Sequence, residues 1–423
     1  MKIILNPKRQ EWEALCERNI PDDSAIEQTV EDILRNVRAS GDTALLDYAR
    51  RFDGYTGDSV ELTEAEILAG SEKVSPEVAE AIRKAAENIS RFHAAQLPEA
   101  VEVETAPGVR CLQRAVPIRR VGLYIPGGRA PLFSTVLMLA LPAKIAGCRE
   151  IILCTPENGE HGIAPEILFA ARLCGIHRVF RVGGAQAVAA MAYGTQSVPK
   201  VDKIFGPGNR FVTKAKQMVS RVTAIDMPAG PSEVMVLADE TADPTFVAAD
   251  MLSQAEHGPD SQAIALCSSS ELAEAVKSEV ERLADTLPRR DSIEGSLSHS
   301  RIIIFPSRED MTEFANDYAP EHLILSVSDP WALADNIYAA GSVFIGNFSP
   351  ESAGDYASGT NHTLPTSGWA RSFSGVNIDS FMHKITYQQL TREGLALLGP
   401  VITSMAHAEG LDAHALAVDV RTK

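Results

Sequence analysis

Short apolar runs with β propensity alternate with helix-like stretches from Arg119 onward, and this alternation limits the fold more than any other feature of the sequence. Five such runs precede a turn-rich segment at 227–233, and five follow it. Strands separated by helices form parallel sheets with helices on both faces. The sequence therefore predicts two doubly wound α/β halves without a residue-level repeat, with strands at 121–125, 150–154, 178–182, 203–205, 223–227, 234–238, 262–267, 301–305, 322–327 and 342–346.

The segments that flank this pattern are helix-like. Apolar residues recur at helical spacing between residues 25 and 96, where Pro76 opens a long helix. From about Asn377 the chain again has a helical pattern with little β signal, and it is too short to bury a core of its own. We expect this C-terminal segment to pack on the body or on a partner subunit.

The charge balance excludes several classes of protein. With 39 basic and 56 acidic residues the net charge is −17, whereas nucleic-acid binding needs a basic face. The longest uncharged apolar stretch, 130–143, is shorter than the roughly 20 residues that span a membrane. Only four apolar residues precede Asn6, too few for a signal peptide. We expect a cytoplasmic protein that binds neither nucleic acid nor a membrane.

The predicted helix that begins at Pro244 points polar side chains inward near its end. Gln254 falls on the same stripe as the apolar Val247, and His257 lies one turn further along. Both side chains can therefore converge on one point. A hydrogen-bonded core glutamine beside a histidine that offsets the helix dipole is an equally good interpretation of this helix alone.

Two further segments contain side chains suited to chemistry. Residues 346–368 include Asp355 and His362 and are rich in glycine, which predicts an irregular functional loop or else a solvated surface loop. Glu321 and His322 lie side by side where a strand begins, with Pro320 making its start irregular. Glutamine, histidine and aspartate without cysteine suit zinc, although manganese also accepts oxygen-rich ligands.

Three glycine-rich turns, at 125–128, 182–187 and 204–209, each follow a predicted strand and precede a helix. Ordinary βα turns have this composition, but three of them in one half favour a cradle of backbone amides for a dinucleotide. There is no GxGxxG fingerprint, and HExxH, GxSxG and P-loop motifs are also absent from the sequence. Six scattered cysteines without a CxxC pair indicate neither a disulfide framework nor a thiolate zinc site.

Seven segments together resemble the histidinol dehydrogenase family. In chain order they are VGLYIPGGRAPLFSTVLMLALPAKIAG, VGGAQAVAA, VDKIFGPGN, DMPAGPSEV, LSQAEHGPDSQ, PEHL and SPESAGDYASGTNH. The resemblance extends from about residue 20 to the C-terminus. It implies the last step of histidine biosynthesis, the oxidation of L-histidinol to L-histidine through histidinal, with two NAD and one zinc ion per site.

The resemblance also implies site residues and a dimer. The implied zinc ligands are Gln254, His257, Asp355 and His414, and the NAD contacts are Tyr124, Gln186 and Asn209. The implied substrate contacts are Ser232, Gln254, His257, His322, Asp355, His362, Glu409 and His414. Because the family forms homodimers whose C-terminal segment reaches the neighbouring subunit, Glu409 and His414 would act in trans.

The implied fold consists of two incomplete Rossmann-like domains. We expect an N-terminal segment at 1–20, a discontinuous domain of 21–123 plus 234–376 that contains the metal and catalytic residues, an NAD-binding domain at 124–233, and a C-terminal helical arm at 377–423 that is swapped between subunits.

The expected chemistry assigns separate roles to the two neighbouring residues. A neutral histidine is suited to accept the hydroxyl proton, so His322 is the candidate base, and Glu321 is the candidate activator of the water that adds to the aldehyde. A thiohemiacetal on Cys111 or Cys148 is a rival route, but neither has a neighbouring histidine. Two rival functions are a family paralogue that oxidises another polar alcohol and a non-catalytic binder of metal and nucleotide.

Overall fold

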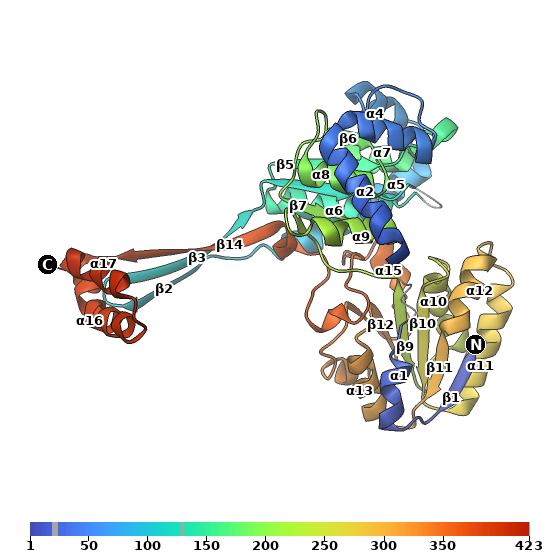
Figure 1. Ribbon diagram of the computed structural model, residues 1–423. Coiled ribbons are helices and arrows are strands. Elements are labelled where there is room, and N and C mark those ends of the chain that lie inside the picture. Colours follow the sequence, from blue (N-terminus) through green and yellow to red (C-terminus); the bar gives the residue numbers. More distant parts are fainter. Residues whose placement is uncertain (19–23, 128–130, 423) are drawn as a thin grey trace.

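The computed structural model describes residues 1–18, 24–127 and 131–422, which form two α/β halves and a long projecting arm (Figure 1). The boundary predicted at residue 20 and the last glycine of the 125–128 turn lie outside the described residues. Among the described residues no helix is long and apolar enough to cross a membrane.

The first half is built on a five-stranded parallel sheet in the order β6-β5-β4-β7-β8. Its strands are β4 (Arg120–Tyr124), β5 (Glu150–Thr155), β6 (Arg178–Arg181), β7 (Lys203–Phe205) and β8 (Ala224–Ile225), connected by α6 (Phe133–Ala146), α7 (Pro165–Cys174), α8 (Gly184–Tyr193) and α9 (Arg210–Val219). The direction of winding reverses between β4 and β7. Ligands of doubly wound sheets bind at the carboxyl ends of the strands at such a reversal.

The second half contains a six-stranded parallel sheet in the order β1-β11-β10-β9-β12-β13. The strands are β1 (Lys2–Leu5), β9 (Glu233–Ala238), β10 (Gln262–Cys267), β11 (Arg301–Ile304), β12 (His322–Ser326) and β13 (Ser342–Ile345). Apart from the edge strand β1, the order repeats that of the first half. The two predicted halves therefore share one winding pattern.

Helices cover both faces of this second sheet. On one face Val234 and Val236 pack against α10 (Pro244–Ala255) and α11 (Ser270–Ala284), with α12 (Arg290–His299) beside them. On the other face Met235 and Leu237 pack against α1 (Trp12–Leu15), α13 (Arg308–Tyr318) and α14 (Pro330–Ala334). Because both faces are covered, all six residues of β9 are buried, which explains the continuous apolar sequence of its last five residues.

The N-terminal helices require a correction of the predicted domains. These helices are α2 (Ser24–Ser40), α3 (Asp42–Tyr48), α4 (Glu64–Ser71) and α5 (Pro76–Ala94). They pack on α6–α9 of the first half, so residues 24–94 join 120–225 and not 234–376. Only the first residues, with β1 and α1, join the second half. An amphipathic stripe predicts that a helix face is buried but does not identify the surface that buries it.

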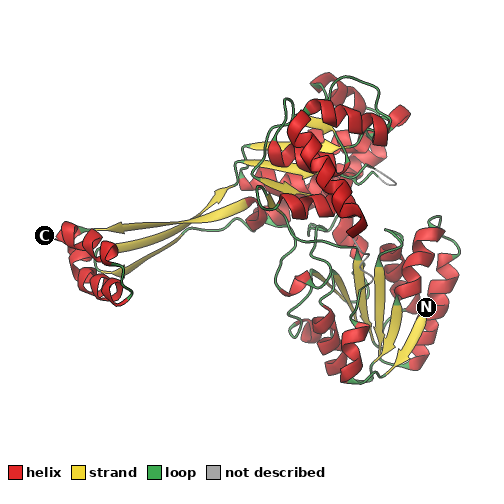
Figure 2. Ribbon diagram, viewed as in Figure 1, coloured by secondary structure: helices red, strands yellow, loops and turns green. Residues whose placement is uncertain are grey.

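The arm is a three-stranded antiparallel sheet that ends in a helical hairpin (Figures 1 and 2). It consists of β2 (Val101–Ala106), β3 (Val109–Pro117) and β14 (Met382–Leu390), followed by α16 (Arg392–Ala408) and α17 (Asp412–Thr422). The prediction of a helical segment from 377 is therefore wrong for β14. Seven of its nine residues are exposed, so it lacks the half-buried alternation that reveals a strand, and its pairing with β3 defines it.

Candidate functional site at the junction of the two halves

The candidate site lies where the amino ends of the second sheet approach the first half. His322 and Glu233 are the first residues of neighbouring strands β12 and β9. The imidazole Nε2 of His362 lies 3.1 Å from the hydroxyl of Thr135, which belongs to the first turn of α6. Since α6 follows β4, this contact joins the carboxyl edge of the first sheet to the amino edge of the second.

Four predicted site residues meet at this amino edge. Gln254 Nε2 lies 2.9 Å from His322 Nδ1, and His322 Nε2 lies 3.4 Å from Asp355 Oδ1. Glu321 Oε2 is 3.6 Å from His322 Nδ1, so the irregular start of β12 brings both neighbouring side chains to one place. Helix α10 runs back across its sheet, which is why its last turn delivers the buried Gln254 to this edge.

The segment 346–368 is not irregular throughout, as the sequence led us to expect. It contains the short helix α15 (Glu351–Tyr356), which brings Asp355 back to the amino edge. Glu351 on the same helix is buried and accepts hydrogen bonds from Ser253 Oγ at 2.7 Å and Gln254 Nε2 at 3.2 Å. The cluster therefore lies at the opposite edge from the one where doubly wound sheets usually bind ligands.

The electrostatics of this cluster are dominated by burial and by carboxylates. Burial alone would lower the pKa of His322, but the nearby Glu321 and Asp355 raise it well above its ordinary value. Burial opposes ionisation of Asp355, yet its contact with His322 lowers the pKa of that carboxyl. Burial raises the pKa of Glu351 to about 8.

Three polar atoms of the cluster have no hydrogen-bond partner among the described residues and could therefore bind a ligand. His322 Nε2 and Asp355 Oδ1 are buried without a hydrogen-bond partner among the described residues. The Gln254 amide nitrogen faces the acceptors Glu233 O and Glu351 Oε2. The amide oxygen of Gln254 has no hydrogen-bond partner among the described residues. An unpaired buried carboxylate oxygen next to an unpaired imidazole nitrogen fits a divalent cation.

A complete metal site needs more than the described residues supply. No three His, Cys, Asp or Glu side chains gather closely enough in the described ranges to hold an ion. His257, exposed just after α10, is near enough to Asp355 to influence its pKa. Gln254, His257 and Asp355 are the side chains here that could contribute ligands to an ion.

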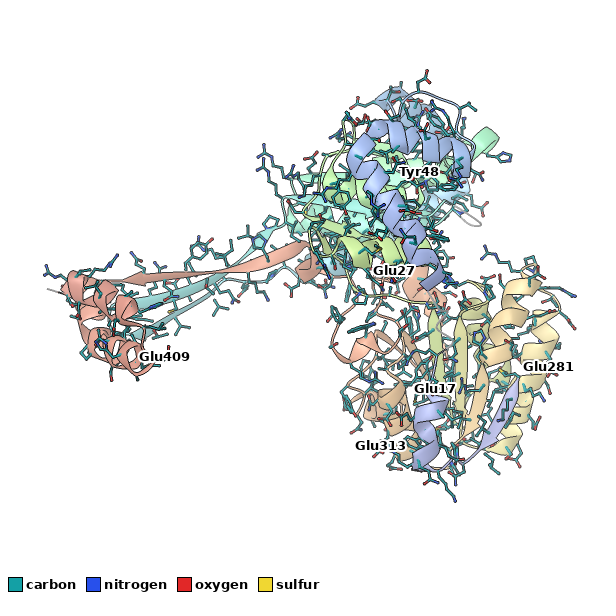
Figure 3. The ribbon with its side chains drawn as sticks, in the orientation of Figure 1. Glu17, Glu27, Tyr48, Glu281, Glu313 and Glu409 are labelled. Carbon is teal, nitrogen blue, oxygen red and sulfur yellow. The ribbon has the colours of Figure 1, made fainter. Side chains whose placement is uncertain are left out.

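The remaining implied substrate contacts divide into two groups. Ser232 directly precedes β9, and His362 Nδ1 lies 2.9 Å from the carbonyl oxygen of Asp355, so both border the cluster. Glu409 lies at the far end of the arm (Figure 3), and His414 lies on the helix α17 beside it. Both are exposed, and the arm end is far from β12 and α15 of the same chain (Figure 1).

The glycine-rich turns gather at the carboxyl edge of the first sheet. Tyr124 ends β4, and its hydroxyl accepts a hydrogen bond from the Gly184 amide at 3.2 Å. Gln186 is buried in the first turn of α8, while the Asn209 side chain caps α9 by accepting from the amides of residues 211 and 212.

Gly206, in the turn between β7 and α9, has a φ of +129°, and a Cβ there would collide with the Tyr124 carbonyl oxygen. Glycine at position 206 therefore allows this turn to pack directly against the end of β4.

The corresponding edge of the second sheet is closed. Asp239 follows β9 and is buried, and its carboxylate accepts hydrogen bonds from Thr241, Ser328 and Arg308. These contacts fill the point where the winding of this sheet reverses.

The cysteine alternative finds no support in the geometry. Cys111 lies on the arm strand β3, and Cys148 packs below the turn that contains Phe381. Burial raises the pKa of the Cys148 thiol to about 12. Neither thiol is part of the cluster.

Comparison with known proteins gives one consistent result. The family model described as histidinol dehydrogenase matches residues 16–422. The histidinol dehydrogenase of Bacteroides fragilis is 55% identical over 422 residues, covering 100% of this chain and 99% of the relative, and that of Escherichia coli is 52% identical over 415 residues, covering 97% and 95%. A crystal structure of histidinol dehydrogenase from Elizabethkingia anophelis superimposes with a TM-score of 0.97 at 48% identity, covering 100% and 98% of the two chains. The resemblance inferred from the motifs is confirmed.

Proposed function

On the premise that this chain belongs to the histidinol dehydrogenase family, we propose that it oxidises L-histidinol to L-histidine through L-histidinal in histidine biosynthesis. The observation that supports this most is the meeting of Glu321, His322, Gln254 and Asp355 beside the glycine-rich edge of the first sheet. A base, a second carboxylate and metal-binding atoms thus lie within reach of a dinucleotide.

His322 removes the hydroxyl proton in each oxidation. This role needs a free lone pair on Nε2 and therefore a proton on Nδ1, which lies 3.2 Å from the Glu233 carbonyl oxygen that can accept it. Gln254 Nε2, at 2.9 Å from the same nitrogen, can only donate and favours the opposite tautomer. Neutralising the charge of Asp355 lowers the pKa of His322 toward the range of a base, while Glu321 stays ionised for its own role.

Glu321 activates the water that converts the aldehyde to its hydrate. Its Oε2 is held by the Glu233 amide at 2.8 Å, and its other oxygen has no partner among the described residues. That oxygen can accept a proton from water as the water adds to the carbonyl carbon. The hydrate then loses its second hydride, with His322 again accepting the proton.

Gln254, His257 and Asp355 would hold a zinc ion together with His414 of a second subunit. Such an ion would orient the imidazole and amino nitrogens of the substrate and stabilise developing charge. Ser232, His362 and Glu409 would complete the contacts to the substrate.

NAD, as the hydride acceptor, would lie at the carboxyl edge of the first sheet near Tyr124, Gln186 and Asn209. The backbone amides of the glycine-rich turns would receive its pyrophosphate, which removes the need for a basic patch in a chain of net charge −17.

The protein acts as a homodimer in this proposal. The helices of the arm expose large apolar side chains on a unit with little core of its own, and more than half of the surface is exposed in Leu397, Val401, Met405, Leu416 and Val420. Apolar patches of this kind mark interaction surfaces. A second copy that covers them would bring Glu409 and His414 to the cluster of its partner.

The test compares L-histidinol with other amino alcohols in a steady-state assay of NADH formation. The proposal predicts that histidinol has the highest kcat/KM and that histidine accumulates. A higher kcat/KM for another alcohol would identify a paralogue with a different substrate, and binding of NADH without turnover of any alcohol would identify a non-catalytic binder.

A further inference from the structure

Glu233 contacts three of the site residues through its main chain. Its amide donates to Glu321 Oε2 at 2.8 Å, and its carbonyl oxygen lies 3.3 Å from Gln254 Nε2 and 3.2 Å from His322 Nδ1. The base, the water-activating carboxylate and the amide ligand are therefore all positioned against one residue. A displacement of Glu233 would change their relative positions.

The side chain of Glu233 is itself fixed by Arg18, a residue 215 positions away in the sequence. Arg18 Nε lies 2.6 Å from Oε1 and Nη2 lies 3.1 Å from Oε2, and the amide of Ser367 donates to Oε1 at 2.8 Å. The Glu233 carboxylate is only 3% exposed. A two-pronged pair of this kind fixes orientation as well as distance.

The same guanidinium also holds the segment that leads into β12. Arg18 Nη2 donates to the carbonyl oxygen of Tyr318 at 2.6 Å, and the guanidinium lies 3.9 Å from the centre of the Tyr318 ring. Tyr318 is fully buried, and its hydroxyl donates to Gln262 Oε1 at 2.6 Å. Glu321 follows only three residues later in the chain.

We propose that Arg18 is a positioning residue for the reaction, because it ties the start of β9 to the segment before β12 and so sets Glu321, His322 and Gln254 against one another. The inference rests on the proposed function, which supplies the roles of these three residues. Arg18 touches none of their reacting atoms and acts through Glu233 and Tyr318.

A second ion pair of the same shape provides a matched control. Arg178 on β6 binds Glu61 through Nε at 2.8 Å and Nη2 at 3.1 Å, and it also links the N-terminal region to a sheet. It belongs to the first half and contacts no residue of the cluster. A purely structural role for Arg18 predicts that both arginines affect stability alone.

The experiment measures kcat, KM for histidinol, KM for NAD and Tm in Arg18→Ala, Glu233→Gln and Arg178→Ala, each with and without millimolar guanidinium chloride. Misplacement of catalytic groups by about 1 Å costs roughly 10²-fold in rate, so we expect kcat to fall by about that factor in Arg18→Ala. KM for NAD should not change. Guanidinium ion should restore part of kcat in Arg18→Ala, where it can occupy the vacated site, and should restore none in Arg178→Ala.

Two results would overturn the proposal. The first is that Arg18→Ala and Arg178→Ala lose similar amounts of Tm and have kcat values within a factor of two or three of each other. The second is that guanidinium does not restore the kcat lost in Arg18→Ala. If Arg18→Ala does not fold, Glu233→Gln decides, because it keeps the shape of the side chain and removes the charge that pairs with Arg18. An unchanged kcat in that variant contradicts the positioning role.

Wild-type protein in the same assay tests the proposed function separately. If it forms NADH from histidinol and the Arg18 variants match the control, the positioning role alone fails. If wild-type protein forms no NADH from histidinol, the proposed function fails and the positioning role fails with it.

Discussion

His322 has a carboxylate near each ring nitrogen, Glu321 beside Nδ1 at 3.6 Å and Asp355 beside Nε2 at 3.4 Å. The sequence placed Glu321 and His322 together and pointed Gln254 inward, because adjacency and helical periodicity are local properties. It could not place Glu233 beside Arg18, since their contact depends on how the N-terminal segment docks. The sequence contained one indication that Glu233 has a special role, because this charged residue directly precedes the apolar run 234–238.

Replacement of His322 by asparagine should lower kcat for both oxidations, since the same base serves each. General base catalysis contributes about 10²–10⁴-fold, so we expect a loss in that range with either histidinol or histidinal supplied as substrate. Stopped-flow measurement of NADH formation from each substrate checks this. A variant that keeps wild-type kcat with either substrate would contradict the assignment of the base.

Glu321→Gln should affect the two oxidations unequally. The amide cannot accept a proton from water, so oxidation of histidinal should fall by about 10²-fold or more while oxidation of histidinol falls less. Single-turnover assays with each substrate separate the two steps. Equal losses in both would argue against a water-activating role confined to the second oxidation.

At the scale of whole elements, the predicted strands of the two sheets are found close to their expected positions, because buried parallel strands have continuous apolar sequence. Helix α15, strand β14 and the packing of the predicted helices α2–α5 could not be anticipated. Helix α15 is short and glycine-containing, strand β14 is mostly exposed, and helices α2–α5 show an apolar stripe that does not identify its partner. Because α15 is short and contains glycine, the segment 346–368 was expected to be irregular, and the return of Asp355 to the amino edge was not foreseen.

The turn between β7 and α9 offers a test at this scale. Gly206→Ala should destabilise the fold and weaken NADH binding, because its φ of +129° and the nearby Tyr124 carbonyl leave no room for a Cβ. Gly162→Ala is the control, since Gly162 has a φ of +69° but no atom within 4 Å of an added Cβ. Backbone strain alone costs about 1–3 kcal/mol, and we expect Gly206→Ala to exceed the cost of Gly162→Ala.

Denaturant unfolding and fluorescence titration with NADH measure these two effects. Gly162→Ala should keep its affinity for NADH despite its strain. If Gly206→Ala binds NADH as tightly as wild type does, the turn at 206–209 is not part of the dinucleotide site.

At the scale of the whole molecule, the proposed site needs residues that the arm holds far from the cluster of the same chain. Glu409 lies at the end of this projection (Figure 3), His414 lies on the neighbouring helix α17, and both arm helices expose apolar side chains. No three His, Cys, Asp or Glu side chains gather to hold an ion in the described ranges, so the proposed zinc site would need a ligand from a second subunit. We predict that a His414→Ala subunit and a Glu321→Gln subunit, each weakly active alone, regain activity when dissociated and reassembled together. One of the two sites of such a heterodimer has every proposed residue.

The readout of that mixture is NADH formation from histidinal, with each variant reassembled by itself as the control. Random pairing yields about half heterodimers, each with one intact site, so roughly a quarter of wild-type activity should return. Activity that stays at the average of the two separate variants, in a sample whose subunits demonstrably exchange, would contradict donation of His414 in trans.

One proposed site performs two successive oxidations, and the ratio of NADH formed to histidinol consumed distinguishes two oxidations from one. With limiting histidinol, excess NAD and added zinc, we predict two NADH for each histidinol and histidine as the product that accumulates. A ratio of one with histidinal released, or consumption of histidinol without histidine, would contradict the account.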